Sequence, residues 1–133
     1  MDRMDDSLPT PTGRLADEDL DALVPRWLDW SQAAEVLGVT VAKVRTMIRD
    51  HELAAAVPRP RAGQQVPADF IDDDGLPVKG LSGLLTVLHD GGYDDREAIA
   101  WMFLDAALPG RPIDALRENR GAEVKRRAQA MAF

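Results

Sequence analysis

Residues 30–49 predict a helix, a tight turn and a second helix, and this pattern constrains the fold more than any other stretch of the chain. We expect Ser31 to cap the first helix through its hydroxyl oxygen. The apolar positions of that helix are Ala34, Val36 and Leu37. Gly38 ends it, because glycine readily adopts the left-handed conformation found at helix ends. Thr40 then caps a second helix that runs to about residue 50.

The second helix divides into an apolar and a polar face. Val41, Val44 and Ile48 recur at helical spacing, so they are expected to face inward. Small, hydroxylated and cationic side chains on the other face suit docking in the major groove of DNA, because the backbone must come close to the bases and cations must reach phosphates. The residues of this outer face are Ala42, Lys43, Arg45, Thr46 and Arg49. We interpret the helix as a recognition helix.

A hairpin with a cationic tip is predicted after this helix. Residues 54–57 and 64–66 are short extended runs on either side of a Pro and Gly tip that carries Arg59 and Arg61. In a winged helix-turn-helix such a hairpin is the wing. The groove-facing or groove-bordering set is then Thr40, Ala42, Lys43, Thr46 and Arg49, with Arg45 on phosphate. The adjacent backbone or minor groove is assigned to Arg59, Arg61 and Gln64.

Helices continue through the rest of the chain. An apolar helix is predicted from about residue 82 to residue 90, and Asp94 with Glu97 has the spacing of a capping box for a second one. A short helix around Ile113 and a final helix over residues 122–132 follow. The fold class is therefore mostly α with a small β-hairpin wing. The organisation is an acidic, Pro-rich disordered arm (1–14), a winged helix-turn-helix with an N-terminal helix (15–71) and a C-terminal helical region packed on it (72–133).

The string SQAAEVLGVTVAKVRTMIRDHELAAAV, with the basic tip and VPADF behind it, resembles the winged helix-turn-helix of MerR-like and excisionase-like DNA-binding proteins. With GLLTVLHDGGYDDREAIAWMF and RPIDALRENRGAEVKRRAQAMAF, the chain from about residue 26 onward is similar to a family of small actinobacterial DNA-binding proteins with a helical C-terminal region. This resemblance implies sequence-specific or architectural binding of double-stranded DNA and no catalysis. Our leading hypothesis for the function is a transcriptional regulator.

The net charge of −7 opposes DNA binding at long range, because attraction to phosphate dominates nucleic-acid affinity. The charge is unevenly distributed, however. Residues 25–71 hold five acids and six bases, whereas residues 1–24 hold seven acids and two bases. Since exposed charges are screened over ~10 Å, a local basic face can still attract DNA. We expect modest, salt-sensitive affinity.

Catalytic and metal chemistry find little support in the sequence. There is no cysteine, and phosphate-loop, dinucleotide, zinc-protease and hydrolase motifs are absent. His51 and His89 lie far apart in sequence without metal-ligand spacing, so we assign each to a helix end as a cation. We therefore expect no enzyme activity, no cofactor and no metal. No apolar run is long enough to span a membrane, and a cytoplasmic location is expected.

A protein-interaction module is the alternative function. The string GRPIDALRENRGAEV resembles the C-terminal segment of Xre/ParS-type antitoxins, so the C-terminal helices are a candidate surface for a protein partner. The outer cations of the last helix, Lys125, Arg126 and Arg127, are either a solvated face or a second contact to DNA. Thr10 and Thr12 lie in the exposed arm, where a Ser/Thr kinase has access and where phosphate would further repel DNA.

Overall fold

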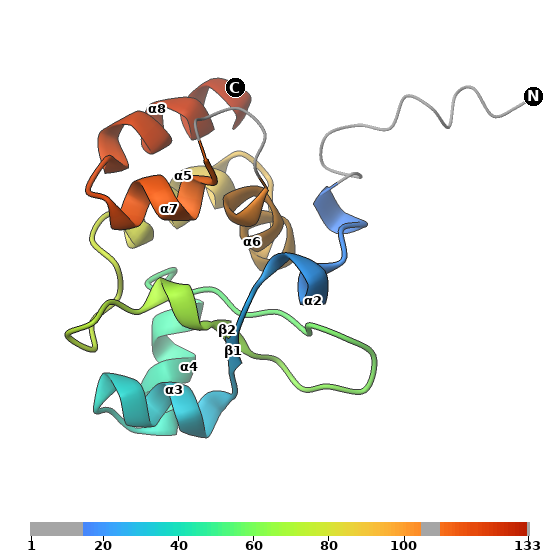
Figure 1. Ribbon diagram of the computed structural model, residues 1–133, viewed down its shortest axis with the longest axis vertical. Coiled ribbons are helices and arrows are strands. Elements are labelled where there is room, and N and C mark those ends of the chain that lie inside the picture. Colours follow the sequence, from blue (N-terminus) through green and yellow to red (C-terminus); the bar gives the residue numbers. More distant parts are fainter. Residues whose placement is uncertain (1–14, 105–109, 133) are drawn as a thin grey trace, which may run out of the picture.

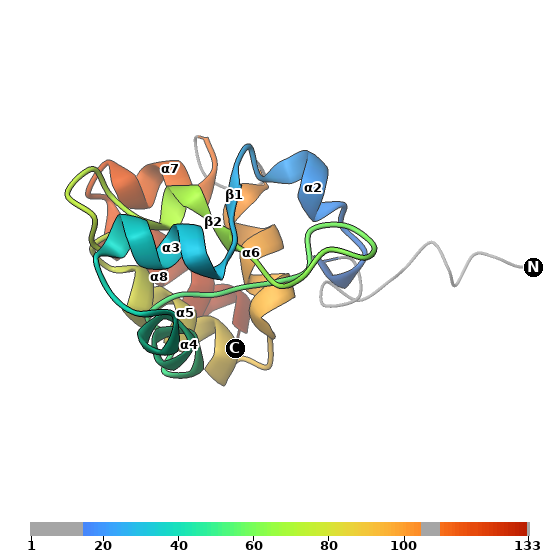
Figure 2. The same ribbon diagram turned by 90° about the horizontal axis from the view of Figure 1, so that it is seen from below.

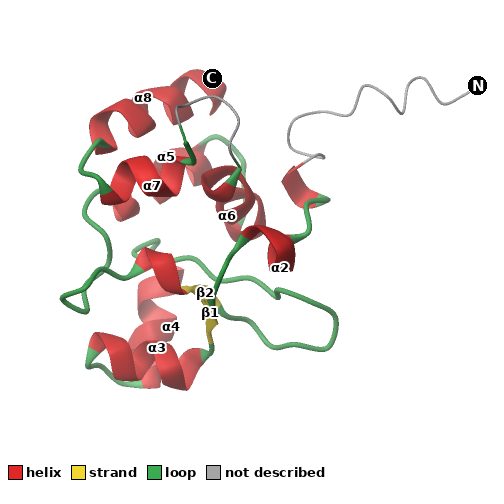
Figure 3. Ribbon diagram, in the orientation of Figure 1, coloured by secondary structure: helices red, strands yellow, loops and turns green. Residues whose placement is uncertain are grey.

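The computed structural model describes residues 15–104 and 110–132, and it consists of two stacked groups of helices (Figure 1). The lower group in this view contains a helix-turn-helix and short extended segments, and the upper group contains the C-terminal helices (Figure 3). The elements of the first group are α2 (Leu20–Leu23), β1 (Trp27–Leu28), α3 (Trp30–Leu37), α4 (Val41–Arg49), β2 (Val66–Pro67) and the 3₁₀ turn η2 (Ala68–Phe70). Those of the second are α5 (Leu81–Asp90), α6 (Asp95–Phe103), α7 (Pro112–Arg117) and α8 (Gly121–Ala132). None of the helices in the described ranges has the length and apolar character that crossing a bilayer requires.

The predicted helix-turn-helix is present, with one change at its start. Helix α3 begins at Trp30, and its cap is Asp29, whose carboxylate accepts from the amide of Gln32 at 2.8 Å while the Gln32 side chain accepts from the Asp29 amide. The expectation that Ser31 caps this helix is therefore wrong, because a reciprocal capping box two residues earlier satisfies more amides. Gly38 ends α3 in the left-handed region with φ 71°, as predicted. Thr40 caps α4 by accepting from the Lys43 amide at 3.1 Å.

The inward faces of the two helices differ from the prediction at several positions. Val36 is 45% exposed, so its assignment to the apolar face of α3 is wrong. Ala33 takes the buried position on that helix instead. On α4, Val44 is buried as expected, and Met47, which was not among the predicted inward positions, is buried as well. Val41 is only half-buried.

The segment predicted as the wing is extended, but its two arms are joined by a single β-bridge and its returning strand pairs with a strand from elsewhere in the chain. Ala56 and Gln65 form an isolated antiparallel bridge through two backbone hydrogen bonds of 3.0 and 2.8 Å. The returning strand β2 then pairs antiparallel with β1, which precedes α3, in the register Leu28 with Val66. The two regular strands thus join the entry to α3 with the exit from the wing, and the loop at residues 57–64 projects from them (Figure 1).

The C-terminal helices follow the local signals closely. Asp94 and Glu97 form the predicted capping box at the start of α6. Val124 and Ala128 are fully buried, as expected for the inner face of α8, which packs on α5. Phe70 from η2 lies 5.9 Å, centroid to centroid, from Phe103 of α6. One hydrophobic cluster therefore runs from Leu53, Val66 and Phe70 into α5, α6, α7 and α8.

A smaller cluster lies between α3 and α4. Its buried members are Leu28, Ala33, Ala34, Val44 and Ile71. The helix-turn-helix thus has little apolar core of its own, and most buried residues of the first group, such as Met47, Leu53 and Phe70, belong to the cluster that also contains the C-terminal helices. This arrangement leaves the outer side of α4 facing solvent.

Candidate nucleic-acid interface

The outer face of α4 carries exposed cations, as the sequence predicts. Lys43, Arg45 and Arg49 are all exposed, and so is Ala42, which comes directly before Lys43 near the start of α4. Lys43 and Arg45 form no ion pair with any part of the chain that the structure describes. Arg49 lies 3.4 Å from the carboxylate of its neighbour Asp50, with side chains 74% and 50% exposed. An ion pair so open to water is weak, so it leaves Arg49 able to exchange its partner for a phosphate.

The two threonines of the predicted set are engaged with their own helix. The Thr40 hydroxyl accepts from the Lys43 amide, and the Thr46 hydroxyl donates to the Ala42 carbonyl at 3.2 Å. Thr46 is also half-buried. Because both hydroxyls satisfy backbone groups, they are less available to base edges than the sequence-based assignment assumed.

The wing carries its cations on an exposed loop. Arg59, Arg61 and Gln64 are exposed. Arg61 has a left-handed backbone with φ 70°, which is uncommon for a residue other than glycine. Arg59 donates to the Asp21 carboxylate at 3.3 Å and so connects the wing to α2. Any phosphate contact by Arg59 therefore competes with this carboxylate.

The wing loop and the recognition helix do not lie side by side. In both views the wing loop extends beside α2, whereas α4 lies well away from the loop and from α2 (Figure 2). The predicted site residues thus form two groups, one on α4 and one on the wing. The α4 group has more cations without an ion pair, since Lys43 and Arg45 have none among the described residues whereas Arg59 of the wing pairs with Asp21.

Other predicted positions fall outside this interface. The arm of residues 1–14, with the candidate phosphorylation sites Thr10 and Thr12, lies outside the described residues. Lys125, Arg126 and Arg127 are exposed on α8, in the upper group of helices.

The structure also brings together two histidines that are far apart in the sequence. His51 follows the end of α4 and His89 lies in the last turn of α5, so their assignment to helix ends is right. Their imidazole rings nevertheless stack on each other, with centroids 4.0 Å apart. No local spacing signals this contact, because the two residues come from different halves of the fold.

Comparison with known proteins gives matches in both halves of the chain. Residues 15–71 match the family model described as DNA-binding protein Rv2175c, wHTH domain, and residues 78–132 match the Rv2175c C-terminal domain of unknown function. The chain is 42% identical over 130 residues to the DNA-binding protein Rv2175c of Mycobacterium tuberculosis (strain ATCC 25618 / H37Rv), an alignment that covers 88% of this chain and 87% of that protein. Its fold is similar to the NMR structure of Rv2175c, with a TM-score of 0.70 and 41% identity over 81% of this chain and 82% of that one.

Proposed function

The chain belongs to the Rv2175c family of winged helix-turn-helix proteins, and we propose that it binds double-stranded DNA through the outer face of α4. The family resemblance drawn from the sequence is thus confirmed, including the helical C-terminal region. The observation that carries the proposal is the placement of Lys43, Arg45 and Arg49 on one exposed helix face that is otherwise small, since Ala42 lets the backbone approach the groove. Its relative is named as a DNA-binding protein.

We assign the contacts to two classes. Lys43, Arg45 and Arg49 supply phosphate contacts and reach into the major groove, whereas Arg61 and Gln64 on the wing touch the neighbouring backbone. Arg59 joins them only when it leaves Asp21. Such a protein acts as a transcriptional regulator in the cytoplasm, without catalysis of its own.

The test is a fluorescence-anisotropy titration of the full chain with fragmented genomic DNA over a range of salt concentrations. Each lost phosphate contact lowers the slope of log affinity against log salt by about 0.9. We expect Lys43→Gln and Arg45→Gln each to weaken binding and to reduce the slope by about that amount. Lys79→Gln is the matched control, because Lys79 is an exposed cation on the segment before α5. A doubly substituted Lys43→Gln/Arg45→Gln chain that keeps the parent's affinity and slope would exclude α4 as the DNA-binding face.

A second comparison tests the wing. Asp21→Asn removes the carboxylate that holds Arg59, so it should tighten DNA binding if Arg59 reaches the backbone. Arg59→Gln should then cancel this gain. If Asp21→Asn changes nothing, Arg59 only stabilises the wing against α2.

The alternative of a protein-interaction module has one supporting observation in the C-terminal helices. Trp101, Arg127, Ala130 and Met131 line an open cavity of about 310 Å³ between α6 and α8. Ala130→Arg would fill this cavity without touching the buried face of α8. A full chain that captures a stoichiometric protein partner, loses it on Ala130→Arg and binds no DNA would favour the module over the regulator.

A further inference from the structure

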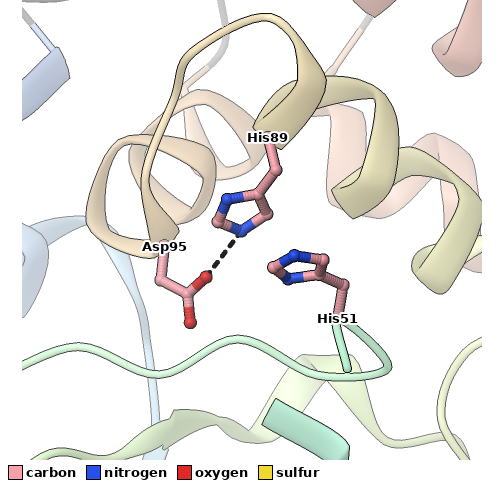
Figure 4. Close-up of side chains that lie close together, drawn as sticks. All are labelled: His51, His89 and Asp95. Atoms are coloured by element: carbon pink, nitrogen blue, oxygen red, sulfur yellow. Dashed lines mark hydrogen bonds and ion pairs between the residues drawn. The ribbon is translucent and has the colours of Figure 1, made fainter. Parts of the chain in front are cut away.

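Three potential metal ligands meet where the helix-turn-helix contacts the C-terminal helices. Each of His51, His89 and Asp95 offers a nitrogen or oxygen atom, and these three atoms all lie within 4.8 Å of one another. Figure 4 shows the two imidazole rings one above the other, with the Asp95 carboxylate beside them. His51 follows α4, His89 is at the end of α5, and Asp95 begins α6. The cluster therefore joins His51, from the end of the helix-turn-helix, to two residues that lie only six positions apart on either side of the turn between α5 and α6.

The carboxylate of this cluster is held in place by a second partner. One oxygen of Asp95 lies 2.7 Å from Nε2 of His89, and the other accepts from the Ala55 amide at 3.1 Å. Both side chains of the pair are only 20–23% exposed. Metal sites commonly use such a supporting hydrogen bond to orient a ligand, because it fixes the direction of the donor atom.

His51 is the member whose environment is incomplete. Its Nδ1 is buried and has no hydrogen-bond partner among the described residues. Its backbone is in the left-handed region, with φ 62°. A buried polar atom without a partner is costly, and a bound ion is one of the ways in which such an atom is satisfied.

We propose that His51, His89 and Asp95 bind a divalent metal ion. The two imidazoles and the carboxylate favour Zn²⁺ as that ion. Imidazole nitrogen with carboxylate oxygen is a donor set that Zn²⁺ accepts, with three protein ligands and one open position for water. Asp95 also lines a cleft of about 320 Å³ together with Ala55 and Gln64, so the carboxylate side of the cluster borders solvent.

The metal requires a small rearrangement of the three side chains. Tetrahedral zinc with bonds of about 2.0–2.2 Å places its ligand atoms ~3.4 Å apart. The His89 to Asp95 contact at 2.7 Å must therefore open slightly, whereas the other two pairs lie within 4.8 Å. The rings must also leave their stacked arrangement, which has an interplanar angle of 20°, because each nitrogen lone pair lies in the plane of its ring.

Such a site joins the end of the recognition helix to the C-terminal helices. Because the ligands come from both groups of helices and do not converge in the unfolded chain, zinc binding adds directly to the stability of the fold. This role is independent of the proposed DNA contact, since none of the three side chains lies on the outer face of α4.

The experiment is a calorimetric titration of the full chain, with any affinity tag removed, with zinc chloride near neutral pH. We expect one Zn²⁺ per chain. His51→Asn and His89→Gln should weaken binding more than ~100-fold, which exceeds the loss caused by removing a supporting partner alone. Asn is chosen for position 51 because it tolerates the left-handed backbone. Asp90→Asn is the matched control, since Asp90 is an exposed carboxylate next to His89 and should keep the parent's affinity.

Two further readouts make the result decisive. His51 and His89 are the only histidines of the chain, so both imidazole signals in an NMR spectrum should shift together as zinc is added. Zinc should also raise the melting temperature of the parent and of Asp90→Asn, but not that of His89→Gln. Circular dichroism with a chelator present shows which variants fold. If His51→Asn does not fold, the binding test rests on His89→Gln. The proposal is overturned if the parent binds no stoichiometric zinc, or if the folded histidine variants bind it as tightly as the parent.

Discussion

Arg96 is predicted to hold the N-terminal segment and the wing against the C-terminal helices. From α6 its guanidinium donates to the carbonyl of Ala16 at 3.0 Å, to that of Glu18 at 2.7 Å and to that of Val57 at 3.4 Å. Three carbonyls from two distant segments thus converge on one side chain. Replacing Arg96 with alanine leaves all three without this donor.

The magnitude follows from the geometry of these bonds. Hydrogen bonds to charged groups each contribute about 1.5–3 kcal/mol to stability, and partial exposure places these near or below the lower limit. The bonds to Ala16 and Glu18 are short, whereas the third is near the distance limit, so we count two. Arg96→Ala should therefore cost about 2–3 kcal/mol of unfolding free energy. For a chain of this size that corresponds to a fall in melting temperature on the order of 6–12 °C.

Urea denaturation followed by circular dichroism measures this loss. Arg96→Lys should recover part of the stability, because an ammonium group reaches one carbonyl but lacks the fork of the guanidinium. Arg126→Ala is the control, since Arg126 is an exposed arginine on α8 and its removal should change the free energy by less than about 0.5 kcal/mol. If Arg96→Ala unfolds at the same urea concentration as Arg126→Ala, the three contacts do not hold the segments together.

Two other predictions concern single positions. Gly75 has φ +78°, and a Cβ at this position would lie 2.8 Å from the Val36 carbonyl oxygen, so Gly75→Ala should cost more than ~2 kcal/mol by urea denaturation. Gly63→Ala, where nothing lies near an added Cβ, should be close to neutral, and equal losses at both sites would contradict the argument. A side-chain hydrogen bond from Arg111 lowers the pKa of Asp114 below its ordinary 3.8. The ionised Asp114 therefore stabilises the fold above pH 3.8, and this contribution disappears as the pH falls through the lowered pKa of the folded state. Acid titration by circular dichroism should therefore show the parent losing stability relative to Asp114→Asn below about pH 4, and parallel curves would refute this.

Local signals in the sequence were sufficient to predict most of the helices. Gly38 and Thr40 mark the turn because a left-handed end and a hydroxyl cap are properties of single residues and their nearest neighbours. The Asp94 and Glu97 capping box is equally local. The same rule explains the error at Ser31, since Asp29 and Gln32 form a reciprocal capping box, which is also a local signal.

Contacts between distant segments were predicted less well. The pairing of β1 with β2 depends on how the wing returns to the entry of α3, and strand pairing of this kind has no local signature. The exposure of Val36 follows from the packing of α3 on its neighbours rather than from its apolar side chain. The ion pair between Arg59 and Asp21, and the stacking of His51 on its partner ring, likewise become visible only in three dimensions.

The division of the chain into two matched domains leads to a final prediction. Residues 15–71 and 78–132 match separate family models, yet Leu53, Val66 and Phe70 are buried in the cluster that also contains the C-terminal helices. Arg117 of α7 also donates to the Asp69 and Ile71 carbonyls at 2.7 and 3.0 Å.

A fragment of residues 15–71 would expose this apolar surface and keep only the small cluster between α3 and α4 as its core. Burial of side chains such as Phe70 contributes about 1.5–3 kcal/mol each, and a domain of this length is marginal even with a complete core. We therefore expect the fragment to lack a cooperative thermal transition, and mixing it with residues 72–133 to restore one. A fragment that melts cooperatively alone, at the temperature of the full chain, would show instead that the winged helix-turn-helix folds independently and that the C-terminal helices are an addition to it.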